Sequence, residues 1–167
     1  STDGILKAGA DVLPLRSNIP ELSKYAYYAI DQSFYERAIQ NQKEHTGFCI
    51  IAGDNYAQGS SREHAALSPR YLGQKFAIAK SYARIGWQNL INFGIIPFEF
   101  KNTSDWDKLE QDDILRIEGL RMAIQNRDSI TAIVVGKNIK IPLEYNISER
   151  QVAHILKGGI INFVKQK

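Results

Sequence analysis

Cysteine is almost absent from this sequence, since Cys49 is the only one among 167 residues. A single thiol excludes a disulfide within the chain and indicates a reducing compartment. It also excludes an iron–sulfur cluster bound by this chain alone, because such a cluster is held by several thiolates. Cys49 and His64 do not have the spacing of zinc ligands, so no zinc site is predicted either.

Long apolar runs and a large excess of one charge are missing too. No run approaches the roughly 18 apolar residues of a membrane-spanning helix, and residues 1–18 lack the pattern of a signal peptide. Lys and Arg number 21 against 18 Asp and Glu, a net charge of +3. These basic residues are scattered, which makes nucleic-acid binding unlikely. The length and the 44% hydrophobic content predict one globular domain over residues 1–167.

The apolar pattern predicts strands that alternate with helices up to about residue 100, and mostly strands after it. Buried strands are expected at 47–53, 75–81 and 95–100, and antiparallel strands with one wet face at 114–119, 129–136 and 139–145. Helices are expected at 20–40 with a break near Asp31, at 61–73, at 82–94 and at 148–159, whereas residues 1–18 are expected to be loop. This order predicts an α/β domain with a mixed sheet flanked by helices.

The stretch GDNYAQGSSREHAAL, residues 53–67, is rich in glycine and polar side chains between a predicted strand and a predicted helix. It is not a phosphate-binding P-loop, because five residues separate Gly53 from Gly59 and Ser60 stands where that motif has lysine. It is not a nucleophile elbow, because no glycine follows Ser61 at the required spacing.

Two interpretations of this stretch remain open from the residues alone. Ser60 and Glu63 have the spacing of a capping box, and a plain helix start is the more common explanation. However, a glycine before the serines, a strand-to-helix turn and the rigid fork of Arg62 together also describe an anion site. The spacing does not identify the anion.

Residues 53–73, GDNYAQGSSREHAALSPRYLG, followed by AIAKSYARIGWQNLINFGIIPFEF at 77–100, resemble the swivel domain of the aconitase family. Residues 1–20, STDGILKAGADVLPLRSNIP, resemble the opening segment of the same family. The similarity covers about residues 1 to 120 and continues loosely to the last helix. The pairing of Gly-Ser-Ser-Arg-Glu-His-Ala with Ala-Lys-Ser-x-Ala-Arg-Ile makes it specific.

The resemblance implies a swivelling β/β/α domain of an aconitate hydratase-type hydro-lyase. Such enzymes interconvert citrate and isocitrate through cis-aconitate by dehydration and rehydration. The family's [4Fe-4S] cluster is bound by cysteines of other domains, so this chain is expected to be a fragment or small subunit. It would be active only with cluster-bearing aconitase domains or a large subunit. The expected compartment is the cytoplasm, or the mitochondrial matrix in a eukaryote.

The resemblance also implies roles for four residues. Ser60 falls on the family's catalytic base, Ser61 and Arg62 on substrate contacts, and Arg16 of LPLRSN on a further carboxylate-binding arginine. These residue types suit the chemistry, because a serine alkoxide needs converging N–H groups and a cation in a water-excluded cleft. His64 is expected to orient the loop rather than transfer protons.

Two positions depart from the family pattern. Ala57 replaces the glycine of an Asn-Tyr-Gly turn, and a positive φ at that position would cost alanine about 1 kcal/mol. Gly86 and Trp87 stand where a His-Arg-like pair is expected. Neither departure removes a proposed site residue.

Two other functions stay open. The small subunits of isopropylmalate and homoaconitate isomerases share the Ser-Ser-Arg-Glu-His core, although AQGSSREHAAL and VLPLRSNIP are closer to the aconitase branch. A non-catalytic RNA- or acid-binding module is the alternative from another class, and the scattered positive charge gives it no basic stripe for RNA.

Overall fold

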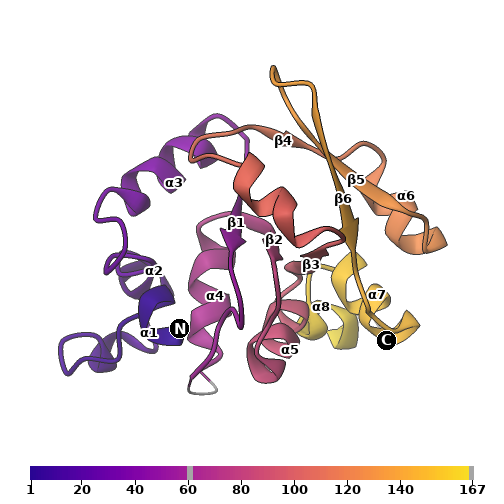
Figure 1. Cartoon of the computed structure of the whole chain (residues 1–167). Helices are drawn as coiled ribbons and strands as arrows, with labels where there is room; N and C mark the ends of the chain where they lie inside the picture. The colour runs from indigo at the N-terminus through magenta and orange to yellow at the C-terminus, as the bar shows by residue number, and fades with distance from the viewer. Residues whose placement is uncertain (60–61, 166–167) are drawn as a thin grey trace.

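The computed structural model of the chain describes residues 1–59 and 62–165. Within these ranges six strands form one mixed sheet in the order β1-β2-β3-β6-β5-β4 (Figure 1). The first three strands are parallel, and the other three are joined antiparallel to them and to each other. The strands are β1 (Phe48–Ala52), β2 (Gln74–Ala79), β3 (Ile96–Phe100), β4 (Leu115–Arg116), β5 (Ile130–Val134) and β6 (Ile139–Glu144).

Helices gather at the two sides of this sheet, with α1–α4 beside β1 and α6–α8 at the opposite side (Figure 1). The α-helices are α1 (Thr2–Ile5), α2 (Ile19–Ser23), α3 (Phe34–Lys43), α4 (His64–Tyr71), α5 (Arg84–Asn92), α6 (Leu120–Asn126), α7 (Glu149–Leu156) and α8 (Ile160–Lys165). Two short 3-10 helices, η1 (Leu13–Leu15) and η2 (Thr103–Lys108), lie in the connections. The predicted α/β domain with a mixed sheet flanked by helices is therefore confirmed.

Two apolar clusters hold these layers together. The larger one centres on Ile78, Phe98 and Ile141 of the sheet, which are fully buried, and includes apolar residues of α5 and α7. The second joins the N-terminal layer to the start of α4, where Ile5 and Leu72 are among its buried members. This second cluster lies under the loop between β1 and α4, so it connects the N-terminal segment to that loop.

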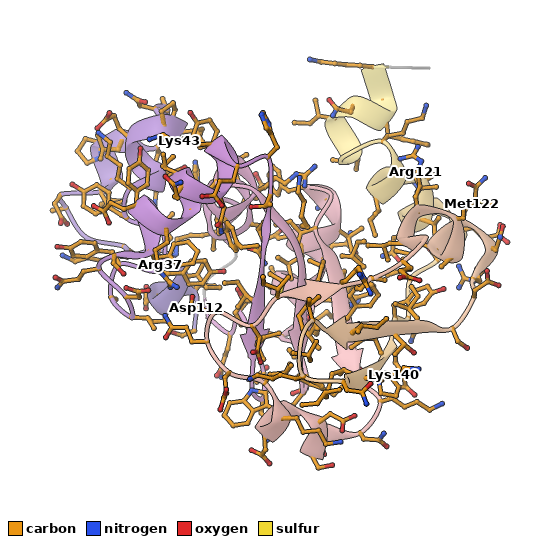
Figure 2. All side chains as sticks on the ribbon, turned by 90° about the horizontal axis from the view of Figure 1, so that it is seen from above. Arg37, Lys43, Asp112, Arg121, Met122 and Lys140 are labelled. Atoms are coloured by element: carbon orange, nitrogen blue, oxygen red, sulfur yellow. The ribbon has the colours of Figure 1, made fainter. Side chains whose placement is uncertain are left out.

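An ion-pair cluster joins α3 to the loop before β4. Arg37 of α3 donates to Asp31 at 2.5 Å and to Asp112 at 2.7 Å (Figure 2). Asp112 lies in the loop before β4, so the cluster joins two segments that are distant in sequence. The break expected near Asp31 is present but much longer than predicted, because residues 24–33 form the connection between α2 and α3.

Most predicted elements are present, and the exceptions have physical causes. The strand over 47–53 is half-buried rather than buried, because β1 is an edge strand. The strand over 114–119 shrinks to β4, and residues 120–126 form the unpredicted helix α6. The capping box of Ser148 and Gln151 is confirmed at the start of α7. After Gly159 the chain continues into α8 rather than ending with α7.

Residues 1–18 are more ordered than the expected loop. The N-terminal helix α1 has Ser1 as its N-cap, whose Oγ accepts a hydrogen bond from Gly4 N at 3.3 Å. A four-residue helix is not stable by itself in water. It forms here because Thr2 and Ile5 are buried against the rest of the domain.

The two departures at positions 57 and 86 prove to be one contact. Ala57 has φ 63°, which is the conformation that costs alanine about 1 kcal/mol at this position. A Cβ on Gly86 would lie only 2.4 Å from the Cβ of Ala57. The alanine methyl therefore occupies the space that a side chain at position 86 would need, and glycine at 86 accommodates alanine at 57.

Gly86→Ala should destabilise the domain by about 1–3 kcal/mol, the usual cost of overpacking a core. Ala57→Gly should change stability by less than about 1 kcal/mol, since relief of the φ strain offsets the lost methyl. The double variant should be more stable than Gly86→Ala alone, because the Cβ–Cβ contact is gone and alanine is the better helix former. Urea unfolding of the four proteins measures this coupling. Strictly additive effects would contradict it.

Candidate functional site

The loop between β1 and α4 is fixed along its first half by the segment that follows β2. Asn55 N donates to Ser81 Oγ at 2.8 Å. Tyr56 N donates to the carbonyl oxygen of Ser81, and Ala83 N donates to that of Tyr56, both at 2.9 Å. Backbone hydrogen bonds thus join residues 53–73 to residues 77–100, the two segments that carry the family resemblance.

Three tyrosines also hold this loop, of which Tyr27 is buried and Tyr56 and Tyr82 are partly buried. The hydroxyls of Tyr27 and Tyr56 lie 2.6 Å apart, and the ring of Tyr82 meets that of Tyr56 edge-on with centroids 5.9 Å apart. Burial raises the pKa of all three phenols, so each stays neutral well above physiological pH. Tyr56 is therefore a structural anchor of the loop, without an ionised hydroxyl to offer a substrate.

The helix expected over 61–73 begins later than predicted. Its first residue is His64, and Glu63 precedes it as the N-cap residue without a side-chain capping bond. A helix start set by a Ser60–Glu63 capping box would come three residues earlier, so that interpretation is wrong for the helix boundary. Arg62, two residues before the helix, has its side chain bonded to the N-terminal segment. Ser60 and Ser61, the predicted catalytic and substrate-contact serines, lie outside the described residues.

Arg62 is fixed by three acceptors of the N-terminal segment. Its Nη1 donates to the carbonyl oxygen of Leu6 at 2.9 Å, and its Nη2 donates to Thr2 Oγ1 at 3.1 Å. Nη2 also forms an ion pair with Asp3. The side chain of Arg62 is 16% exposed and that of Asp3 is 72% exposed. These contacts hold the guanidinium in one orientation, and most of the Arg62 side chain is buried.

Thr2 and Asp3 are site residues that the sequence reasoning did not identify. They belong to the segment STDGI, which was expected to be loop. The only signal was their place in the opening segment of the family resemblance. Local sequence patterns cannot predict contacts between residues that are about 60 positions apart in the chain.

The predicted arginines Arg16 and Arg62 line the same pocket, although they are far apart in sequence. His64 and Lys7 also line it, so its polar lining is basic. His64 Nε2 donates to the carbonyl oxygen of Arg16 at 3.1 Å, which ties the start of α4 to the segment after η1. The remaining lining is apolar or backbone from the N-terminal segment: Leu6, Ala8, Val12, Leu13 and Leu22.

The pocket has the composition of an anion site with an apolar floor. Arg16 and Lys7 are exposed, whereas Arg62 and His64 are partly buried. Guanidinium groups match carboxylates with two parallel hydrogen bonds, and low solvent access strengthens such pairs.

The side chains that commonly bind metal ions are dispersed over the part of the chain that the structure describes. Among residues 1–59 and 62–165, no three His, Cys, Asp or Glu side chains come together to hold a metal ion. Burial raises the pKa of the Cys49 thiol to about 12, so it stays protonated. Across the same part of the chain, no helix is both long and apolar enough to span a bilayer.

Comparison with known proteins finds a matching family model and similar hydratases and dehydratases. The aconitase C-terminal domain model matches residues 15–103, which include Arg16 and positions 60–62. A putative mitochondrial aconitate hydratase of Emericella nidulans is 37% identical over 123 residues, 71% of this chain and 16% of that protein. Homocitrate dehydratase of Saccharomyces cerevisiae is 37% identical over 122 residues, 69% of this chain and 16% of that protein.

A solved structure extends the likeness over the whole fold. The crystal structure of 3-isopropylmalate dehydratase from Methanocaldococcus jannaschii has a TM-score of 0.76 and 31% identity, and the match covers 99% of this chain and 86% of that one. By contrast, the chain spans only about 16% of the length of the first aconitate hydratase. The family match covers more than half of the sequence and the fold agrees nearly throughout. The chain therefore belongs to the aconitase C-terminal domain family.

Proposed function

We propose that this chain is the substrate-clamping domain of an aconitase-type hydro-lyase, which interconverts citrate and isocitrate by dehydration and rehydration. The observation that supports this most is the basic pocket that Arg16 and Arg62 share. Both arginines were assigned to carboxylate binding from the resemblance, and the pocket adjoins the loop that contains positions 60 and 61. A tricarboxylic acid offers several carboxylates that the basic side chains of this pocket can pair with.

In this proposal Arg62 and Arg16 bind substrate carboxylates, and Ser61 makes a further substrate contact. Ser60 is the base that removes the proton beside a carboxylate in dehydration and returns it in rehydration. The proposal for the serines rests on the motif and on their neighbours, Gly59 and Arg62. Arg62 is cationic and oriented, so it stabilises negative charge that develops nearby.

The [4Fe-4S] cluster of the proposed enzyme has to be bound by other aconitase domains or by a large subunit. Cys49 is the only cysteine of the chain, and its buried thiol is protonated. The chain therefore cannot hold the cluster by itself. Active enzyme requires the cluster-bearing polypeptide as partner, in the cytoplasm or, in a eukaryote, in the mitochondrial matrix.

The isolated chain should take up no stoichiometric cluster and show no hydratase activity, whereas the chain with its cluster-bearing domains should dehydrate citrate and isocitrate. Anaerobic reconstitution with iron and sulfide, followed by absorption spectroscopy and an assay of cis-aconitate formation, measures both. A stoichiometric cluster on the isolated chain would contradict the proposal.

A second candidate function is that of an isopropylmalate or homoaconitate isomerase subunit. The likeness to 3-isopropylmalate dehydratase, with a TM-score of 0.76 and 31% identity over 99% of this chain, supports this candidate. Assaying the same reconstituted enzyme with isopropylmalate and homoaconitate separates the two. Failure with every hydroxy acid, combined with carboxylate binding, would favour a non-catalytic acid-binding module.

A further inference from the structure

Thr2 contacts the chain on both sides of positions 60 and 61. Its backbone N donates to the carbonyl oxygen of Gln58 at 2.7 Å. Its Oγ1 accepts a hydrogen bond from Arg62 Nη2 at 3.1 Å. The residue is 2% exposed, although it is the second residue of the chain.

The loop also closes on Thr2 at Gly59. A Cβ at position 59 would lie 2.5 Å from Thr2 Oγ1, and Gly59 has φ +124°. Both observations require glycine at this position, because the contact is too short and the conformation is one that other residues rarely adopt. Thr2 thus contacts the loop at three residues. Its backbone N–H bonds to Gln58, and its Oγ1 lies against Gly59 and accepts from Arg62.

A packing role alone does not account for this arrangement. A buried apolar residue of the same size would fill the space, but it could not accept the hydrogen bond from Arg62. The N–H of Thr2 lies at the start of α1, where helical N–H groups have no partner within the helix. This N–H donates to the carbonyl oxygen of Gln58 instead, so hydrogen bonds, which are directional, join α1 to the loop.

We propose that Thr2 is a positioning residue for the loop that contains Ser60 and Ser61. It fixes the backbone at Gln58 before the serines and the guanidinium of Arg62 after them. Only residues 60 and 61 complete the chain between Gly59 and Arg62, so both ends of the serine segment are held at one residue. This inference rests on the proposed function, because the loop is assigned its chemistry there.

The effect of Thr2 should reach the reaction through Arg62 and the loop. Displacement of a reacting group by about 1 Å can lower a rate by roughly 10²-fold. Thr2→Val keeps the size and the backbone N–H but removes the acceptor of Arg62 Nη2, which retains Asp3. We therefore expect kcat/KM to fall by about 10-fold, with both a lower kcat and a higher KM. Thr2→Ser retains the hydroxyl and should restore kcat/KM to within about 2-fold of wild type.

The test uses the complete enzyme, with the cluster-bearing domains present. Steady-state kinetics of Thr2→Val and Thr2→Ser are compared with those of Thr46→Val, a matched control. Thr46 is exposed and its Oγ1 bonds to Asn41 O at 3.1 Å, away from the loop. Hydrogen exchange of the amides from Gln58 to Arg62 provides a readout independent of activity. It should be faster in Thr2→Val and unchanged in Thr2→Ser and Thr46→Val.

The outcomes separate the inference from the proposed function. If Thr2→Val matches wild type in kinetics and exchange while Ser60→Gly is inactive, the positioning role is overturned and the function stands. If Ser60→Gly is active, the proposed function fails, and exchange alone decides whether Thr2 holds the loop. Thr2→Ala is measured alongside, so that poor folding of the valine variant leaves the test intact. Equal loss in Thr2→Ser and Thr2→Val would also overturn the role of the hydroxyl.

Discussion

Replacing Ser60 by alanine in the assembled enzyme should lower turnover by about 10²–10⁴-fold, the usual cost of removing a proton-transfer group. The melting temperature should change little. A lost helix cap would cost about 1 kcal/mol, or roughly 2–4 °C for a domain of this size. That loss is not expected, because α4 begins at His64 and Glu63 occupies the N-cap position. Kinetics and thermal unfolding of the same preparation measure the two effects separately.

Ser60→Gly and Ser61→Ala complete this experiment. Ser60→Gly also removes the hydroxyl, and glycine costs only a few tenths of a kcal/mol even at a helix cap. It should be as inactive as Ser60→Ala. Ser61→Ala should weaken substrate binding and lower turnover less, because its proposed role is contact. Near-normal turnover of Ser60→Gly would show that the serine is not the base.

The parts of the fold that the sequence predicted correctly are those with local signals. The apolar runs at 75–81 and 95–100 predicted β2 and β3, and the Ser148–Gln151 spacing predicted the start of α7. In each case the pattern within a few residues determines the structure.

The parts that were missed depend on contacts between distant segments. The helix α1 has four residues and is held by burial against the domain, which no local pattern reports. In the site, Arg62 could be proposed from its motif, but its partners Leu6, Thr2 and Asp3 could not. The capping-box spacing also placed the start of α4 three residues too early, since the helix begins at His64.

Arg62→Lys should impair the enzyme severely although it conserves the charge. The guanidinium donates from two nitrogens to acceptors in different places, Leu6 O from Nη1 and Thr2 Oγ1 with Asp3 from Nη2. A lysine ammonium is a single nitrogen and cannot reproduce this fork or pair with a carboxylate in two parallel bonds. We expect kcat/KM to fall by about 10²–10³-fold, the range found when one donor to a developing anion is lost.

The same substitution should also destabilise the isolated domain, by about 1–3 kcal/mol, because the carbonyl oxygen of buried Leu6 loses its donor. A second variant is therefore needed that disturbs Arg62 with little loss of stability. Asp3→Asn removes only the ion pair between Arg62 and the exposed Asp3 side chain, so it should lower the free energy of unfolding by less than about 1 kcal/mol.

Arg16→Lys is the control, because it makes the same replacement of a guanidinium by an ammonium at an exposed position. Arg16 is exposed, and His64 contacts it through the backbone oxygen, which the substitution leaves in place. Its KM should rise and its turnover fall by a smaller factor than for Arg62→Lys, because an exposed cation is screened by water. Urea unfolding should show Arg16→Lys to be as stable as wild type. If Arg62→Lys retained wild-type kcat/KM once its stability loss is allowed for, Arg62 would be a structural tie between the loop and the N-terminal segment rather than a carboxylate-binding residue.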